Sequence, residues 1–125
     1  MNGLEVVELI PQGRLSRLIS GKNQENAYRE VQNLVATSPI FQIYHDGVLA
    51  VLRGYGMTLE VARPRLIELF TKVLRHFAAD GELTDLDHQH IDRLADLFGF
   101  DQALRSELIN STLPAIKAEV ESRQK

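Results

Sequence analysis

The sequence predicts an all-α fold: a single compact bundle of about six mostly antiparallel helices. Apolar residues recur at three- and four-residue spacing along most of the chain, and almost none alternate with the period of two that is typical of strands. Gly, Pro and Asn divide the chain into helix-length pieces joined by two to six residues, which indicates antiparallel neighbours. Because 125 residues suffice for one core, we expect a single helical domain over residues 1–125.

The first elements are short. Residues 1–22 are expected to form a loosely packed N-terminal arm, with a half-ordered helix or an arm over 4–10 and one or two helical turns over 14–19. Residues 23–36 form a better helix, with Asn23 as its N-cap.

Two serine and threonine caps introduce the middle of the chain. Ser38 as N-cap and Pro39 at the first helical position predict a helix with a continuous apolar face that Gly54 ends. Gly47 in its middle indicates either close packing of two helices or a break. Thr58 caps a short segment, and Pro64 is expected to open a new helix.

Gly81 is expected to stop that helix. Thr84 then caps a helix with Asp87 in capping-box position. Its inner stripe is predicted to be Leu86, His90, Ile91, Leu94, Leu97 and Phe98.

The C-terminal region is expected to hold two helices. Asp101 caps residues 102–110, and the pair before Pro114 starts a last helix that frays at the end of the chain.

The acidic residues are concentrated between Asp80 and Asp101. This stretch has a local charge of −6, whereas the whole chain has a net charge of −3. Its first four carboxylates lie within eight residues: Asp80, Glu82, Asp85 and Asp87. Hard cations prefer several oxygen ligands at one point, so the turn is a candidate site for Ca²⁺ or Mg²⁺ rather than Zn²⁺. The alternative is that these acids only end one helix and cap the next.

Histidines add two further possibilities. His76 lies four residues before Asp80, a spacing that places two ligands on one metal, and His88 would complete such a site. A small metal-dependent hydrolase or lyase using His76 and Asp80 is therefore an alternative function. No phosphate-binding loop, nucleophile elbow or zinc-protease motif is present in the sequence, so a non-enzymatic module is the main prediction. His90 is expected to be a buried or half-buried core residue.

A partner could dock on the outer stripe of the 85–98 helix. That stripe carries Asp85, His88, Asp92 and Asp96. Like charges four residues apart repel by a few tenths of a kcal/mol, which a basic partner would relieve. The alternative is a solvated face. A helical homodimer is also open, because Phe41, Tyr44, Tyr55 and Met57 together exceed what one core is expected to cover.

The acidic stretch resembles a known family. Residues 78–85, AADGELTD, followed by a helix ending Leu97-Phe98-Gly99-Phe100, are similar to the signature of TerB-like domains, found in tellurite-resistance proteins and next to J-domains of some co-chaperones. The likeness covers roughly residues 66–110. It implies a compact helical bundle that binds divalent metal through its acids and serves stress-response or membrane-associated complexes.

By position, Asp80 matches the Asp of the family's Asp-Gly turn, and Asp85 and Asp87 match its acidic helix start. The chain departs from the family in having Asp where Glu is usual, and in lacking a second acidic motif in its first half. A tellurite-related role therefore does not follow.

Composition excludes several classes. No Cys is present, so there is neither a disulfide nor a thiolate metal site. Glu5 and Glu8 precede any base, unlike a signal peptide, and no apolar run approaches the ~18–20 residues that span a bilayer. Scattered bases argue against nucleic-acid binding. We expect a cytoplasmic module with a protein partner or self-association and no membrane insertion, with a membrane-associated complex left open.

Overall fold

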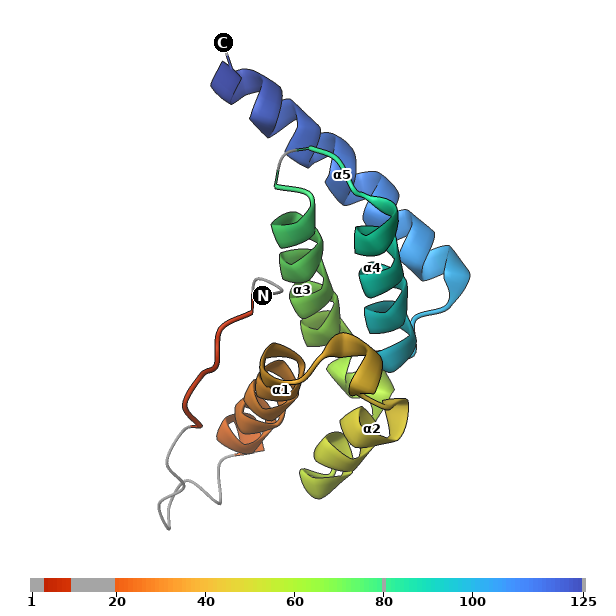
Figure 1. Ribbon diagram of the computed structural model, residues 1–125. Helices are drawn as coiled ribbons and strands as arrows, with labels where there is room; N and C mark the ends of the chain where they lie inside the picture. Colours follow the sequence, from red (N-terminus) through yellow and green to blue (C-terminus); the bar gives the residue numbers. More distant parts are fainter. Residues whose placement is uncertain (1–3, 10–19, 80, 125) are drawn as a thin grey trace.

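The computed structural model describes residues 4–9, 20–79 and 81–124. Within them five α-helices and one short 3₁₀-helix follow one another, and no β-strand occurs (Figure 1). The elements are α1 (Ser20–Thr37), η2 (Ile40–Gln42), α2 (His45–Gly54), α3 (Leu59–Phe77), α4 (Asp85–Leu97) and α5 (Gln102–Gln124). The all-α class is confirmed, with five helices in the bundle instead of about six.

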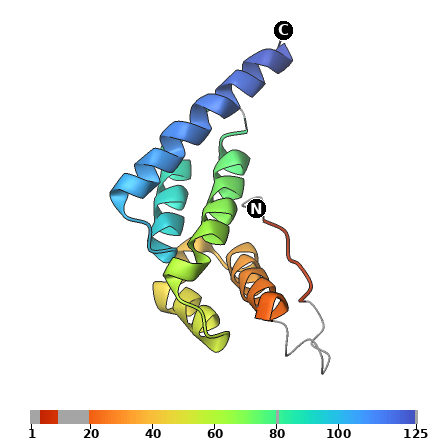
Figure 2. The ribbon, with the colours of Figure 1, turned by 180° about the vertical axis from the view of Figure 1, so that it is seen from behind.

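Helix α3 is the centre of the bundle, because it packs on α1, α2, α4 and α5. Helices α3 and α4 lie side by side, and α5 runs along them and continues past the turn that joins them (Figures 1 and 2). Helices α1 and α2 pack together at the opposite end. The largest fully buried side chains are Phe70, Phe98, Leu52, Leu66, Leu74, Ile91, Leu94 and Leu97.

Two of the three prolines expected to start helices lie inside them. Pro64 is within α3, which begins after the N-cap Thr58, and Pro114 is within an unbroken α5. Proline has no N–H, so the carbonyls of Glu60 and Asn110 lose their usual helical partner, at a cost of about 3 kcal/mol per site. Helix α3 nevertheless keeps a buried apolar face on both sides of Pro64, where Ala62 and Leu66 are fully buried. In α5, Ile116 is buried two residues after Pro114. Burial of these side chains overrides the local preference.

The continuous helix predicted from Ser38 to Gly54 is wrong. The chain forms the single 3₁₀ turn of η2, and then Ile43 and Tyr44 adopt extended backbone before α2 begins. The break turns Ile43 into the core, where it is 4% exposed, and leaves Tyr44 72% exposed. A Cβ added at Gly47 would meet only the Leu34 side chain at an ordinary 3.9 Å, so close packing does not require this glycine.

At the N-terminus, residues 4–9 are not helical, and Leu4 is buried in the core cluster. The turns predicted over 14–19 lie outside the described residues. Helix α1 begins at Ser20, so Asn23 lies within it and is not its N-cap.

The cap of α4 is confirmed. The Thr84 side chain accepts a hydrogen bond from Asp87 N at 3.1 Å, and the Asp87 carboxylate accepts one from Thr84 N at 3.0 Å. Asp101 likewise accepts a bond from the N–H of Leu104 at the start of α5, at 2.8 Å. One member of the predicted inner stripe is wrong, since Leu86 is 58% exposed.

Candidate functional site

The acidic turn joins α3 to α4 and was the first candidate site. The helix ends at Phe77, and Gly81 adopts a positive φ of 91° with its N–H bonded to Ala78 O at 2.8 Å. Asp87 bonds to the N-cap, which confirms its capping role. Glu82 and Asp85 are exposed. Asp80 lies outside the described residues, so a metal site that includes it stays a prediction.

The histidines do not form a metal cluster with the acids that the structure describes. Among residues 4–9, 20–79 and 81–124, no group of three or more His, Asp or Glu side chains is placed to hold a metal ion. His76 is exposed in the last turn of α3, and His88 is exposed on α4. Convergence of these two with Asp80, which the hydrolase alternative requires, depends on a residue outside the described part and stays a prediction.

The predicted docking stripe on α4 does face solvent, since Asp85, His88, Asp92 and Asp96 are all exposed. A cationic side chain from the next helix already lies beside two of its carboxylates. The Arg105 guanidinium lies 3.4 Å from an Asp92 oxygen and 3.9 Å from an Asp96 oxygen. This base comes from α5 and relieves the repulsion for which the sequence suggested a partner.

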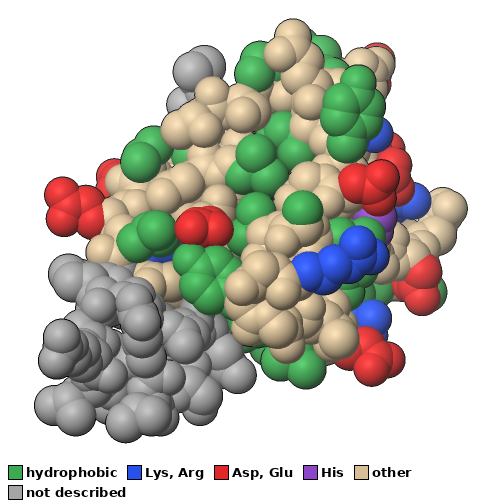
Figure 3. Space-filling model, turned by 90° about the horizontal axis from the view of Figure 1, so that it is seen from below, with side chains coloured by type: hydrophobic (Ala, Val, Ile, Leu, Met, Phe, Trp, Pro, Cys, Tyr) green, Lys and Arg blue, Asp and Glu red, His purple; other side chains and the backbone are tan. Residues whose placement is uncertain are grey.

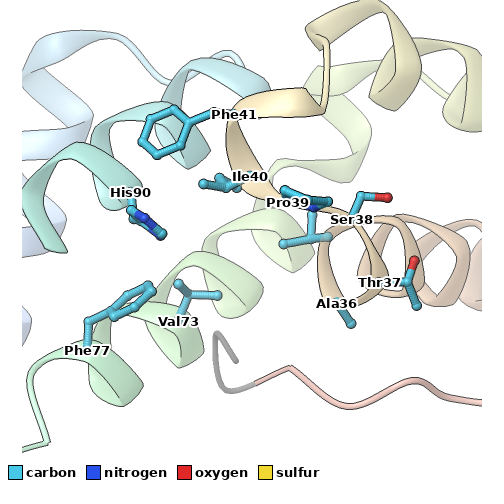
Figure 4. Close-up of a pocket in the computed structure, with 10 residues that line it drawn as sticks. Ala36, Thr37, Ser38, Pro39, Ile40, Phe41, Val73, Phe77 and His90 are labelled. Carbon is cyan, nitrogen blue, oxygen red and sulfur yellow. The ribbon is translucent and has the colours of Figure 1, made fainter. Parts of the chain in front are cut away.

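A pocket that the sequence did not predict lies where the end of α1, η2, α3 and α4 meet (Figure 4). It has a volume of about 370 Å³, toward the lower end of ligand-binding pockets, which span roughly 300–1,000 Å³. Most of its wall is apolar. The lining residues are Val35, Ala36, Thr37, Ser38, Pro39, Ile40, Phe41, Val73, Phe77 and His90.

The sequence places these side chains through three local features. Pro39 and the single turn of η2 swing Phe41 away from the core, so that it is 52% exposed. Phe77 is the last residue of α3. His90 sits on the α4 face toward η2, one turn after the exposed Leu86.

His90 is held between two aromatic rings (Figure 4). Its ring centroid is 5.1 Å from Phe41 and 5.3 Å from Phe77, with interplanar angles of 89° and 76°. These are edge-to-face contacts. No hydrogen bond within the described part of the chain reaches the imidazole nitrogens. The half-buried position expected for His90 is confirmed, and its ring is the polar group of an otherwise apolar pocket.

The hydroxyl of Thr37, also in the lining, is already used. It donates to Asn33 O at 2.7 Å, as β-hydroxyls commonly do toward the previous turn of a helix. Ser38 also lines the pocket, and its hydroxyl points away from His90 (Figure 4). The pocket therefore offers a mostly apolar wall with an imidazole, which suits a ligand with a flat apolar body and one polar tip.

Sequence reasoning missed the pocket because its walls come from residues that are far apart in the chain. The available signal was Phe41, already noted as an aromatic in excess of the core. Of the four residues noted there, Phe41 and Tyr44 are more than half exposed, whereas Met57 is buried at 6%. Seen from below, hydrophobic side chains are interspersed with acidic and basic ones (Figure 3).

Comparison with protein-family models, curated proteins and solved structures finds no match to this chain. The likeness to TerB-like domains therefore stays a prediction from the sequence. None of the helices that the structure describes is both long and apolar enough to cross a membrane. The fold is a helical bundle, and its described part contains a pocket lined by two phenylalanines and a histidine.

Proposed function

We propose that this protein is a non-enzymatic interaction module that binds a partner protein by taking an aromatic side chain of the partner, Trp or Tyr, into the pocket at His90. The observation that carries the proposal is a mostly apolar pocket that contains an imidazole without a hydrogen bond from the described chain. Trp and Tyr combine a flat apolar body with one N–H or O–H, and they dominate the anchors of protein interfaces.

The rim of the pocket favours a protein surface over a small solute. Phe41 is 52% exposed at the mouth, and Leu86 is 58% exposed on the same face of α4 as His90. Exposed apolar residues around a pocket exclude water from a central anchor once a partner covers them. The surface that a partner would cover around one pocket is small, so we expect a weak, transient complex.

The test is an NMR titration of the isotope-labelled protein with N-acetyl-tryptophanamide and N-acetyl-tyrosinamide. We expect saturable changes in chemical shift that are confined to the amide signals of residues 35–41, 73–77 and 90. His90→Phe keeps a ring but removes the polar group, and should weaken binding roughly three- to tenfold, as expected for one neutral hydrogen bond. Ala36→Phe places a large side chain in the pocket and should abolish binding of both amides.

His88→Phe is the matched control, since it makes the same change two residues away on the exposed face of α4. It should leave binding unchanged. Shifts that are absent up to the solubility limit, or that survive Ala36→Phe, would refute the proposal. Saturable binding of the amides without recognition of any Trp- or Tyr-containing peptide would indicate a small-molecule site instead.

A second candidate is divalent-metal binding at the acidic turn through Asp80, Glu82, Asp85 and Asp87, as the resemblance implies. The specific support is that Glu82 and Asp85 are both exposed, three residues apart between Gly81 and the first turn of α4. Calorimetric titration with Ca²⁺, Mg²⁺, Mn²⁺ and Zn²⁺ should then show heat that disappears in Asp80→Asn/Asp85→Asn. No heat and no thermal stabilisation with any ion at millimolar concentration would reduce the turn to a helix cap.

A further inference from the structure

Residues 4–9 lie extended along α1, and three side chains of that helix hold them (Figures 1 and 2). Gln32 Nε2 donates to Glu5 O at 2.7 Å, and Arg29 Nη1 donates to Glu8 O at 2.7 Å. The Asn33 amide makes two bonds to Val7, accepting from its N–H at 2.7 Å and donating to its C=O at 2.8 Å.

All four hydrogen bonds go to the main chain of the segment. The paired bonds of the Asn33 amide to one residue imitate the edge of a β-sheet, where main-chain bonds supply affinity for any extended peptide. Side-chain selection falls mainly on one position, because Leu4 is 8% exposed and joins the core cluster, whereas Val7 is half-buried and Val6 is 64% exposed. This face of α1 therefore binds an extended peptide backbone and accommodates one aliphatic side chain.

The charges beside the segment would also favour an acidic peptide. A polar groove borders the segment, lined on the helix side by Arg29, Arg65 and Lys72 against the single acid Glu25. The Arg65 guanidinium donates to both oxygens of Glu25, at 2.8 and 3.1 Å, and it also lies 3.3 Å from Glu68. Arg29 shares Glu25, at 3.5 Å. The three bases on this side of the groove therefore exceed the acids that pair with them by one positive charge. The segment that fills it, LEVVEL, carries two acids and no base.

We propose that the α1 face bearing Arg29, Gln32 and Asn33 is a second binding site, for an extended acidic peptide of a partner protein with an aliphatic residue at the Leu4 position. Residues 4–9 fill this site in cis. A partner peptide binds only where it displaces them. This site is separate from the pocket at His90, so each proposal stands or fails alone.

The cis segment is a strong competitor. A tethered ligand has an effective concentration in the millimolar range, so a free peptide of equal affinity barely competes at micromolar concentration. Two full-length variants should release the segment. Leu4→Asp removes the anchor, and Val7→Pro removes the N–H that Asn33 accepts without altering a core side chain.

The probe is a synthetic peptide of residues 1–10 with a C-terminal fluorophore, followed by fluorescence anisotropy. We expect Leu4→Asp and Val7→Pro proteins to bind it at least about tenfold tighter than the wild-type chain does. Adding Asn33→Leu to either variant should weaken binding roughly tenfold, because two hydrogen bonds are lost. Asn110→Leu makes the same change on the exposed face of α5 and should have no effect.

Peptide binding that survives Asn33→Leu would overturn the assignment, as would no saturable binding by Val7→Pro protein up to 1 mM peptide. Circular dichroism and thermal unfolding confirm that each variant is folded, and Val7→Pro decides the question should Leu4→Asp unfold. A peptide with Asp in place of Leu4 should fail to compete. Higher salt should weaken binding if the positive groove contributes.

Discussion

The two side chains of the α4 capping box allow a direct test of what the acidic turn does. Thr84 and Asp87 exchange hydrogen bonds of 3.1 and 3.0 Å, whereas Asp85 is equally close to the helix start but makes no cap bond. Replacing each by Ala separates capping from simple electrostatics. All three side chains lie near the surface, so no core packing changes with them.

The expected losses follow from these contacts. Thr84→Ala removes a cap and should lower the free energy of unfolding by about 1 kcal/mol. Asp87→Ala removes a bond to Thr84 N and a favourable charge at the helix start, together about 1 kcal/mol. Asp85→Ala removes only the charge, about 0.3 kcal/mol at physiological salt. For a chain of this length, 1 kcal/mol corresponds to about 3–5 °C in Tm.

The assay is urea unfolding followed by circular dichroism, with and without millimolar Ca²⁺. The reasoning fails if Asp85→Ala costs as much as Asp87→Ala, because charge alone would then explain both. It also fails if either cap variant is as stable as the wild-type protein. Stabilisation by Ca²⁺ that Asp85→Ala abolishes would add a metal role to the turn.

Three further outcomes follow from the structure. Ile91→Ala should cost about 2–5 kcal/mol by leaving a cavity, whereas Leu86→Ala on the same helix should cost less than about 0.5 kcal/mol, both checked by urea unfolding. Gly99→Ala should cost about 1–2 kcal/mol, because Gly99 has a φ of +71° and an added Cβ would lie 3.0 Å from a neighbouring side chain. Burial, and then a 2.9 Å hydrogen bond to Glu30, raise the pKa of Tyr55 above 10.0, so this tyrosine stabilises the fold below pH 10 and the contribution disappears as pH rises through its folded pKa. Tyr55→Phe should therefore flatten the fall in stability above pH 10, and an unchanged alkaline slope would contradict the assignment.

Two of the capping signals predicted helix starts correctly because they are local, whereas the caps predicted at Asn23 and Ser38 were wrong. Thr84 with Asp87, and Asp101 alone, each satisfy N–H groups within three residues, and both caps are present in the structure. Proline failed as a signal because its preference for a first turn competes with packing. Where buried side chains lie close to the proline, as around Pro64 and Pro114, core burial outweighs one lost hydrogen bond.

The candidate sites show the same contrast between local features, which the sequence predicts, and long-range contacts, which it does not. Exposure of the α4 stripe followed from helical periodicity, but Arg105 as its counter-charge did not, because that base comes from the next helix. The pocket joins residues about fifty positions apart, such as Phe41 and His90. Asn33 holds Val7 across 26 residues. Contacts of this kind arise from the fold, and no spacing in the sequence encodes them.

Helix α1 contributes to both proposed sites. Its middle, at Arg29 to Asn33, holds residues 4–9, and its end, at Val35 to Thr37, lines the pocket at His90. Any shift or rotation of α1 that accompanies binding at one surface changes the free energy of binding at the other. Thermodynamic linkage requires that effect to be equal in both directions. A partner that carries both an acidic extended segment and an aromatic anchor would thus bind cooperatively or anticooperatively, according to whether the two ligands favour the same position of this one helix.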